Sequence, residues 1–306
     1  MRYVQDVYEP GSLAKPFSVL MALERKLVTP EDMINCENGY WTEKKLGDTG
    51  RYKELSVSDV IKKSSNIGTA KIAQMLGKND VYNALRRFGF NTLSGLPFSS
   101  EQKGFFPVPQ RWDSLTISRI PIGYSFSTTL LQLLRAYCGL ANNGRIPYLK
   151  LVHGMRDPET GKVEVLPSKG FKESGADPVQ LRKLIDMMVS VTAKDGTARR
   201  AAIPGFQVAG KTGTSRKNIE AVRDPVTKKI IRKSGYAENQ HYTSFAGFVP
   251  AHAPRLVMVI TVDNPKNGHG GGLVAAPVFK NVMERSLRYL NVQPTEPYPE
   301  PKVGRL

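Results

Sequence analysis

The sequence has few cysteines and no long apolar run, so neither a disulfide or metal framework nor a membrane span identifies its structural class. Only two cysteines occur, Cys36 and Cys138, and they have neither metal-ligand spacing nor a nearby histidine, so we interpret them as buried thiols. No apolar run reaches about 18 residues, and the first residues lack the apolar region of a signal peptide. The absences leave a chain of ordinary globular composition, with 40% hydrophobic and 23% charged residues.

Acidic residues are scarce beside basic ones: 27 Asp and Glu stand against 44 Lys and Arg, which gives a net charge of +17. Such an excess attracts anionic partners. The basic residues are scattered, and no aromatic-rich nucleic-acid motif accompanies them. We therefore expect no nucleic-acid partner and interpret the charge as a surface property suited to a polyanionic neighbourhood.

Hydrophobic periodicity and capping residues predict helices in the first two thirds of the chain and a strand meander in the last third. The last strand, Leu256 to Val262, is continuously apolar and suits a central strand. An antiparallel sheet flanked by helices follows as the architecture, with a loose Pro-rich tail from Gln293. The expected helices cover residues 12–24, 56–64, 66–76, 79–88, 128–142, 179–193 and 273–290, and the strands 206–215, 243–250 and 255–263.

A Ser-x-x-Lys pattern opens the first predicted helix at Ser12 and Lys15. Residues three apart on a helix share a face, so the lysine can reach the hydroxyl, and a partly desolvated lysine can act as its base. The helix N-terminus adds backbone N–H groups near a developing oxyanion. The pattern alone is weak, because about one match is expected by chance. A second match, Ser100 to Lys103, is interpreted as a solvated loop.

Ser64-Ser65-Asn66 is the only Ser-x-Asn of the chain. A helix N-cap explains it as well as a catalytic role does, because Ser and Asn both favour that position.

Lys211-Thr212-Gly213-Thr214 lies inside a predicted strand. A glycine in an edge strand allows a substrate backbone to approach closely, and two threonine hydroxyls with a lysine suit a carboxylate. The same segment, read from Gly205 to Thr212, satisfies the Walker A pattern. A phosphate loop must follow a strand and open a helix, but its spacer residues look like a strand and no amphipathic helix follows. Nucleotide binding is therefore the minor alternative.

The order of the three motifs carries more information than any one of them. Ser-x-x-Lys, Ser-x-Asn and Lys-Thr-Gly form the signature set of penicillin-binding proteins and serine β-lactamases. The spacings, 52 residues from Ser12 to Ser64 and 147 from Ser64 to Lys211, fit that family. Further segments resemble class B penicillin-binding proteins of the division type: Tyr8–Ser12, Ile122–Tyr124, Leu131–Leu133, Gly196–Ala198, Ser244–Pro250 and Gly270–Phe279.

The resemblance implies a peptidoglycan D,D-transpeptidase with the α+β fold of that family, an antiparallel sheet flanked by helices with an all-helical subdomain. Ser12 would attack the penultimate D-Ala of a stem peptide, and an amine of a neighbouring stem peptide would resolve the ester. By similarity, Lys15 is the base, Ser64 and the cationic Lys211 protonate the leaving amine, and Asn66 binds the donor amide. The carboxylate would lie on Thr212, Gly213 and Thr214, and the N–H groups of Ser12 and Thr214 would form the oxyanion hole. No metal or cofactor is implied.

The family domain normally begins well before its Ser-x-x-Lys, whereas 11 residues precede Ser12 here. We expect the first strands to be missing, the edge beside them to be exposed and the chain alone to fold poorly. The expected domain covers 1–292, with the helical subdomain at about 27–195, the sheet portion at about 196–292 and the tail at 293–306.

By the same resemblance, the partners are stem peptides, β-lactams as covalent inhibitors, and in full-length proteins a septal glycosyltransferase and other divisome proteins. The family works at the outer, periplasmic face of the bacterial cytoplasmic membrane, where an N-terminal helix absent from this chain anchors it. Two alternatives share the motif set: a serine β-lactamase or β-lactam sensor, and an inactive penicillin-binding fragment. No glutamate in a suitable loop stands out as a water-activating group for a β-lactamase.

Overall fold

The structure is a computed structural model that describes residues 1–298 except 220, 224–226, 228–229, 233, 267 and 269. Six of its helices are longer than one turn: α2 (Lys15–Glu24), α3 (Val57–Lys62), α4 (Asn66–Arg86), α6 (Leu130–Ala141), α7 (Pro178–Ser190) and α8 (Gly271–Tyr289). The short turns are α1 (Arg2–Gln5), α5 (Thr116–Arg119), η1 (Gly11–Ala14), η2 (Glu37–Gly39), η3 (Thr42–Lys44), η4 (Pro109–Arg111), η5 (Ile120–Ile122) and η6 (Arg199–Ala201). Gly77, with a φ of 74°, breaks α4 where the sequence predicts a gap between two helices.

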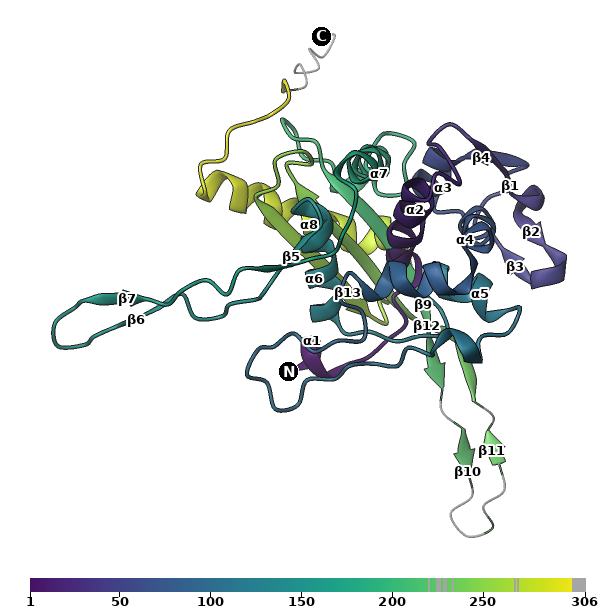
Figure 1. Ribbon diagram of the computed structural model, residues 1–306, viewed down its shortest axis with the longest axis horizontal. Coiled ribbons are helices and arrows are strands. Elements are labelled where there is room, and N and C mark those ends of the chain that lie inside the picture. Colours follow the sequence, from purple (N-terminus) through teal and green to yellow (C-terminus); the bar gives the residue numbers. More distant parts are fainter. Residues whose placement is uncertain are drawn as a thin grey trace.

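A three-stranded antiparallel sheet forms the centre of the molecule (Figure 1). Its strands are β9 (Ala209–Ile219), β12 (Gly235–Val249) and β13 (Leu256–Asp263), in the order β13-β12-β9. Helices α6 and α8 both pack against this sheet. The predicted α+β architecture of helices around an antiparallel sheet is therefore confirmed.

The position of β13 differs from the prediction of a central strand. β12 is the central strand, and β13 pairs with β12 along one side only among the described residues. Every residue of β13 is half-buried. Its continuous apolar run follows from the packing of α6 and α8 against the strand, not from a strand on each side.

The range 27–195 is not all-helical, because four two-stranded antiparallel sheets accompany its helices in the described part of the chain. They pair β1 (Met33–Asn35) with β4 (Glu54–Ser56), β2 (Tyr40–Trp41) with β3 (Leu46–Gly47), β5 (Arg145–Pro147) with β8 (Phe171–Glu173) and β6 (Gly154–Arg156) with β7 (Val163–Val165). Strands of two or three residues are too short for periodicity to reveal. The β6–β7 hairpin projects from the body, and so does the extension of the central sheet that carries β10 (Val222–Arg223) and β11 (Ile230–Arg232) (Figure 1).

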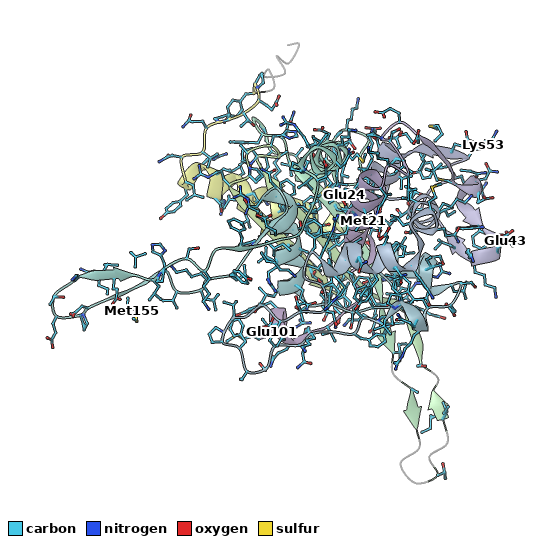
Figure 2. All side chains as sticks on the ribbon, viewed as in Figure 1. Met21, Glu24, Glu43, Lys53, Glu101 and Met155 are labelled. Atoms are coloured by element: carbon cyan, nitrogen blue, oxygen red, sulfur yellow. The ribbon has the colours of Figure 1, made fainter. Side chains whose placement is uncertain are left out.

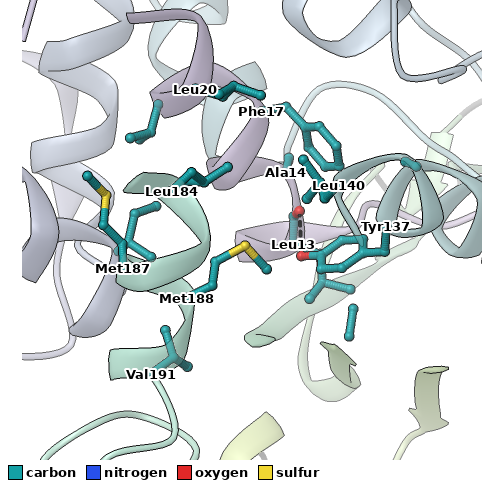
Figure 3. Packing of buried hydrophobic residues seen from close by; sticks show 14 of the residues in the cluster. Leu13, Ala14, Phe17, Leu20, Tyr137, Leu140, Leu184, Met187, Met188 and Val191 are labelled. Carbon is teal, nitrogen blue, oxygen red and sulfur yellow. Dashed lines mark hydrogen bonds between the residues drawn. The ribbon is translucent and has the colours of Figure 1, made fainter. Parts of the chain in front are cut away.

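Helix α2 runs through the hydrophobic core, and all its residues from Lys15 to Leu23 are buried. Phe17 and Leu20 pack with Leu184 and Met188 of α7 in one cluster (Figure 3). A helix surrounded on all sides has no polar face, which explains its weak amphipathic pattern. This burial holds the start of α2, where the first motif lies, in a fixed place.

Part of the C-terminal tail is packed and not loose as predicted. The backbone N–H groups of Thr295 and Glu296 both donate to the carbonyl of Gly205, at 2.9 and 3.0 Å. Residues 299–306 of the predicted tail lie outside the described residues. Within the part of the chain that the structure describes, no helix has both the length and the apolar character needed to cross a bilayer.

Candidate active site

Ser12 lies in the 3-10 turn η1, directly before α2, so the helix predicted from Ser12 begins with a tighter turn. Gly11 has a φ of 55°, and a Cβ there would lie 2.8 Å from the carbonyl of Thr214, so only glycine fits this close approach. On the other side, the buried Tyr137 hydroxyl donates to the carbonyl of Leu13 at 3.1 Å (Figure 3). These contacts fix the backbone around Ser12, the predicted nucleophile, between β9 and α6.

Lys15 is fully buried, with 0% exposure. Its Nζ donates to Asn66 Oδ1 at 2.8 Å, to Ser64 Oγ at 3.2 Å and to the Ser64 carbonyl. Burial lowers the pKa of Lys15 to about 7, against the opposing effect of the Asp48 charge. An amine with this pKa is neutral in a large fraction of molecules near neutral pH, which suits a base. Among the described residues, Lys15 makes no hydrogen bond to Ser12, its predicted partner.

The Ser-x-Asn motif forms the junction between α3 and α4. Ser65 is the N-cap of α4, and its Oγ accepts from the N–H of Gly68 at 2.9 Å. Ser64 precedes it with a φ of 59°, a strained value for a serine, which turns its side chain toward the two lysines. The capping and the catalytic interpretations of this motif are therefore both compatible with the structure, because neighbouring residues serve them.

Lys211 is also fully buried, and its Nζ donates to Ser64 Oγ at 2.7 Å. Ser64 Oγ thus lies between two amines, one from α2 and one from β9. Burial and the neighbouring Lys15 lower the pKa of Lys211 well below its ordinary value. Both amines hydrogen-bond to the same hydroxyl, so two positive charges there would repel each other strongly in a site without water. Lys15 and Lys211 therefore favour states in which one of the two amines is neutral.

The Lys-Thr-Gly segment lies in β9, an edge strand among the described residues, as predicted. The strand continues to Ile219 with no helix after Thr212, so the segment cannot be a phosphate loop. Thr212 and Thr214 line the cleft beside Ser12, but Gly213 is not among its described lining residues. A Cβ on Gly213 would lie 2.8 Å from Leu13 Cγ, so its missing side chain makes room for the segment that contains Ser12 and not for a substrate.

One cleft of 360 Å³ brings most of the predicted residues together. Its described lining includes side chains from all three motifs. These motifs span 199 positions of the sequence, from Ser12 to Lys211. The two lysines, Lys15 and Lys211, are buried behind the cleft. The lining from the motifs is Ser12, Ser64, Asn66, Thr212 and Thr214. Hydroxyl and amide groups of the three motifs therefore line one space that a peptide end can enter, in front of the two buried amines.

Asp48 is a site residue that the sequence interpretation missed. Its carboxylate accepts from the backbone N–H groups of Asn66 and Ile67 and from the hydroxyl of Ser65. The preceding carbonyl, of Gly47, accepts from Asn66 Nδ2 at 2.8 Å, which leaves Asn66 Oδ1 to face Lys15. No motif pointed to Asp48, because it lies in a turn-rich segment that meets the active site only through the fold.

Thr197 is a second missed residue, and it lines the same cleft. Its Oγ1 accepts from Thr212 Oγ1 at 3.2 Å. Lys62 and Lys63 hold the loop before it through ion pairs to Asp195, at 2.7 and 3.4 Å. The Gly196–Ala198 segment resembles the family in sequence, but the hydrogen bond between Thr197 and Thr212 could be found only in the structure.

Comparison with known proteins gives the family. A family profile described as "Penicillin binding protein transpeptidase domain" matches residues 1–284. The chain belongs to the transpeptidase family of penicillin-binding proteins. The resemblance to the class B members, inferred from segments such as Tyr8–Ser12 and Gly270–Phe279, is confirmed by the relatives and the solved structure described next.

Two curated relatives illustrate the match. The chain is 34% identical over 297 residues to "Probable peptidoglycan D,D-transpeptidase PenA" of Neisseria flavescens, covering 97% of this chain and 68% of the relative. It is 31% identical over 294 residues to "Peptidoglycan D,D-transpeptidase FtsI" of Escherichia coli, covering 96% of this chain and 46% of the relative. The chain thus spans about half the length of this second penicillin-binding protein.

A solved structure supports the fold. The transpeptidase domain of Burkholderia pseudomallei penicillin-binding protein 3, in its apo form, superposes with a TM-score of 0.81 at 31% identity. The match covers 97% of this chain and 83% of that one. A penicillin-binding transpeptidase fold therefore underlies the cleft described above.

Proposed function

We propose that this chain is the catalytic part of a peptidoglycan D,D-transpeptidase that cross-links stem peptides through an acyl-enzyme on Ser12. The observation that carries the proposal is the pair of dehydrated lysines, Lys15 and Lys211, which meet at the hydroxyl of Ser64 behind the nucleophile. A serine hydroxyl needs a nearby base to become a nucleophile, and a buried amine with a pKa of about 7 supplies it. The names of the relatives support the same reaction.

In the acylation step, the proton of the Ser12 hydroxyl moves to neutral Lys15 as Oγ attacks the carbonyl carbon of the penultimate D-Ala. The backbone N–H groups of Ser12 and Thr214 stabilise the oxyanion. The bond to the terminal D-Ala nitrogen then breaks, and Ser64 passes a proton to that leaving amine, with Lys211 on its other side. The hydroxyls of Thr212 and Thr214 bind the carboxylate of the departing residue.

The ester on Ser12 is resolved by an amine of a neighbouring stem peptide. The amine nitrogen attacks the ester carbonyl, the new amide bond forms, and the proton that the amine loses returns to the Ser12 oxygen through the lysine and serine network. Asn66 binds the amide of the donor chain during both steps, and its Oδ1 is oriented by Lys15. Transfer to an amine and not to water distinguishes a transpeptidase from a β-lactamase.

We assign the reaction to septal wall synthesis at the outer face of the cytoplasmic membrane. The resemblance of the Tyr8–Ser12 and Gly270–Phe279 segments to division-type enzymes and the similarity to FtsI support this role. A septal glycosyltransferase and other divisome proteins are the partners that this role requires. Peptidoglycan stem peptides are its substrates, and β-lactams, which imitate their D-Ala-D-Ala end, are its covalent inhibitors.

Labelling with a fluorescent penicillin tests the proposal directly. The chain should form a stable adduct, and Ser12→Ala should abolish it without changing the thermal melt. Rapid turnover of the label would identify a β-lactamase instead. An absence of labelling in a chain that melts cooperatively would contradict the acylation chemistry.

A further inference from the structure

Glu9 precedes Ser12 by three positions and has no role in the reaction proposed above. Its side chain is only 7% exposed, and it forms no ion pair with a lysine or arginine among the described residues. A buried carboxylate without a cationic partner loses hydration that packing alone does not replace. The position of this charge therefore points to a role in the neighbouring site and not in filling the core.

One oxygen of the Glu9 carboxylate accepts hydrogen bonds from two separate segments. The backbone N–H of Ser125 donates to Oε1 at 2.8 Å, and the hydroxyl of Tyr236 donates to the same oxygen at 3.2 Å. Ser125 lies between η5 and α6, and Tyr236 lies at the start of β12. Burial raises the pKa of Glu9, and these two bonds oppose the rise. The carboxylate thus joins the segment before Ser12 to two segments that are distant in the sequence.

Tyr124 lies directly beside both of these hydrogen bonds. The residue after it, Ser125, is held by Glu9 through its backbone N–H. The ring of Tyr236, whose hydroxyl Glu9 also holds, meets the ring of Tyr124 edge to face, with 5.9 Å between the centroids and 81° between the planes. Such an edge-to-face pair orients both rings. Glu9 therefore constrains Tyr124 from its backbone and from its ring.

The backbone around Tyr124 is strained. Ser125 has a φ of 62°, in the left-handed region that a serine rarely adopts, and Gly123 has a φ of 86°. A Cβ on Gly123 would lie 1.9 Å from the carbonyl oxygen of Gly11, so this turn is pressed against the turn that carries the nucleophile. A strained serine persists only where its surroundings hold it, and Glu9 supplies the acceptor for its N–H. Loss of that acceptor would let the turn relax and move Tyr124.

The side chain of Tyr124 lies in the wall of the catalytic cleft, whose lining also includes Ser12 and Asn66. Tyr124 lines the adjoining cleft of 690 Å³ as well, so it lies where the two clefts meet. A side chain in this wall contacts a bound ligand, but it takes no part in the proton transfers assigned to the two lysines. Its position therefore acts on the binding of the ligand and not on the chemical step.

We propose that Glu9 is a positioning residue, which holds Tyr124 in the wall of the catalytic cleft. It acts through Ser125 and Tyr236, and it is not among the described lining residues of either cleft. The inference rests on the proposed function, because the ligand that contacts Tyr124 is the one that acylates Ser12. Glu9 thereby raises the affinity of the noncovalent complex that precedes acylation.

Stopped-flow acylation over a range of penicillin concentrations separates affinity from chemistry. The concentration dependence gives the dissociation constant of the noncovalent complex and the acylation rate constant at saturation. Glu9→Met removes the acceptor of both hydrogen bonds, so it should raise the dissociation constant about tenfold and change the saturated rate less than about threefold. An unchanged dissociation constant in Glu9→Met would overturn the inference.

The conservative variant gives the rescue. Glu9→Gln keeps an acceptor oxygen of the same reach, so its dissociation constant should stay within about threefold of that of the unaltered chain. Thermal melts of Glu9→Met and Glu9→Gln accompany the kinetics. A loss of melting temperature in Glu9→Met with an unchanged dissociation constant would assign Glu9 to stability alone.

Glu101, labelled in Figure 2, provides a matched control. Its carboxylate also accepts from a backbone N–H and a hydroxyl, both of Ser94, at 2.7 and 2.8 Å. Neither residue is among the described lining of the two clefts around Tyr124. Glu101→Met removes the same kinds of hydrogen bond, and the dissociation constant should change less than about twofold. Equal increases in Glu101→Met and Glu9→Met would assign the effect to general destabilisation and overturn the inference.

A double-mutant cycle tests whether Glu9 acts through Tyr124. Tyr124→Leu removes the ring that Glu9 holds, so adding Glu9→Met should raise the dissociation constant by less than about twofold more. A further tenfold increase would show that Glu9 acts on the cleft independently of Tyr124, and would contradict the proposed route.

Tyr236→Phe carries the test if Glu9→Met does not fold. Tyr236 is 44% exposed, so the loss of its hydroxyl leaves the fold intact and removes one of the two bonds to Glu9. The dissociation constant should rise about threefold, because one hydrogen bond is lost and the ring remains. A constant equal to that of the unaltered chain would overturn the inference in that case.

Labelling of the unaltered chain separates this inference from the proposed function. A stable adduct with equal dissociation constants in the unaltered chain and in Glu9→Met leaves the transpeptidase in place and removes the role of Glu9. An absence of adduct in the unaltered chain overturns both. The two failures are thus distinguishable.

Discussion

The chain contains the same four-residue pattern twice, in two regions that the fold treats differently. Ser12 and Lys15 lie at the start of a fully buried helix, with Lys15 at 0% exposure. Ser100 and Lys103 lie in an exposed loop, as predicted. The backbone carbonyl of Lys103 accepts hydrogen bonds from the side chains of Asn91 and Gln132, at 3.3 and 3.0 Å. The Lys103 side chain is exposed.

The difference shows that the chemistry comes from the surroundings of the pattern. Lys15 is shielded from solvent, and its amine donates hydrogen bonds to Ser64 and Asn66 instead. Burial lowers its pKa to about 7, so a large fraction of the amine is neutral near neutral pH, as its proposed role as a base requires. Ser100 and Lys103 are exposed and have no such surroundings, so we expect no catalytic role for them. The predictions below compare the two regions.

Removing each lysine amine should give the largest difference between the two regions. Lys15→Met should slow penicillin acylation by about 10³-fold, because the base is lost while the buried volume is kept. Lys103→Met should leave the rate unchanged within about twofold. Stopped-flow acylation kinetics of both variants measure this. Equal effects would show that burial does not distinguish the two lysines.

The pH dependence of acylation should follow Lys15. Below about pH 7 the amine is protonated, so the rate should rise about tenfold per pH unit, and above about pH 7 it should level off as the neutral amine predominates. The Lys103→Met variant should give the same profile. A rate that stays flat from about pH 5 to about pH 9 would contradict the assignment of Lys15 as the base.

Asp48 acts on the region around Lys15, through hydrogen bonds to the start of α4 and through its charge. Asp48→Ala should lower the free energy of unfolding by about 1–2 kcal/mol, because the N–H groups at the start of α4 lose their acceptor. It should also move the midpoint of the acylation profile to lower pH, since the Asp48 charge raises the pKa of Lys15. Denaturant melts and acylation profiles measure the two effects. A midpoint that moves to higher pH would contradict this electrostatic role.

The hydroxyl of Tyr137 should give the smallest effect. Tyr137→Phe removes the buried hydrogen bond to the carbonyl of Leu13 and should lower the free energy of unfolding by about 1 kcal/mol. Ser100→Ala, in the exposed loop, should change it by less than about 0.5 kcal/mol. Urea unfolding of both variants makes the comparison. A larger loss in Ser100→Ala would reverse the contrast.

The predicted helices and the three-motif site were accessible from the sequence because both rest on short patterns that can be read without knowing the fold. The capping residues Ser56 and Ser65 mark helix starts, and their capping hydrogen bonds are present. Motif order and spacing selected Ser12 over Ser100 without structural information. The capping signals are local, whereas the selection of Ser12 used the order and spacing of short motifs along the whole chain.

The rest depends on contacts between distant segments. Asp48 has no capping signature of its own, yet it holds the start of a helix that begins 18 positions later. Gly213 was expected to admit a substrate, but the side chain of Leu13 occupies the space. The apolar run of β13 does not reveal which side of the strand is paired, so its position at the edge of the sheet required the structure.

Peptide mapping by mass spectrometry after penicillin treatment tests the central claim most directly. The account predicts one acylated peptide, with the adduct on Ser12, and an unmodified peptide around Ser100. An adduct on Ser100, on Ser64 or spread over several serines would contradict it.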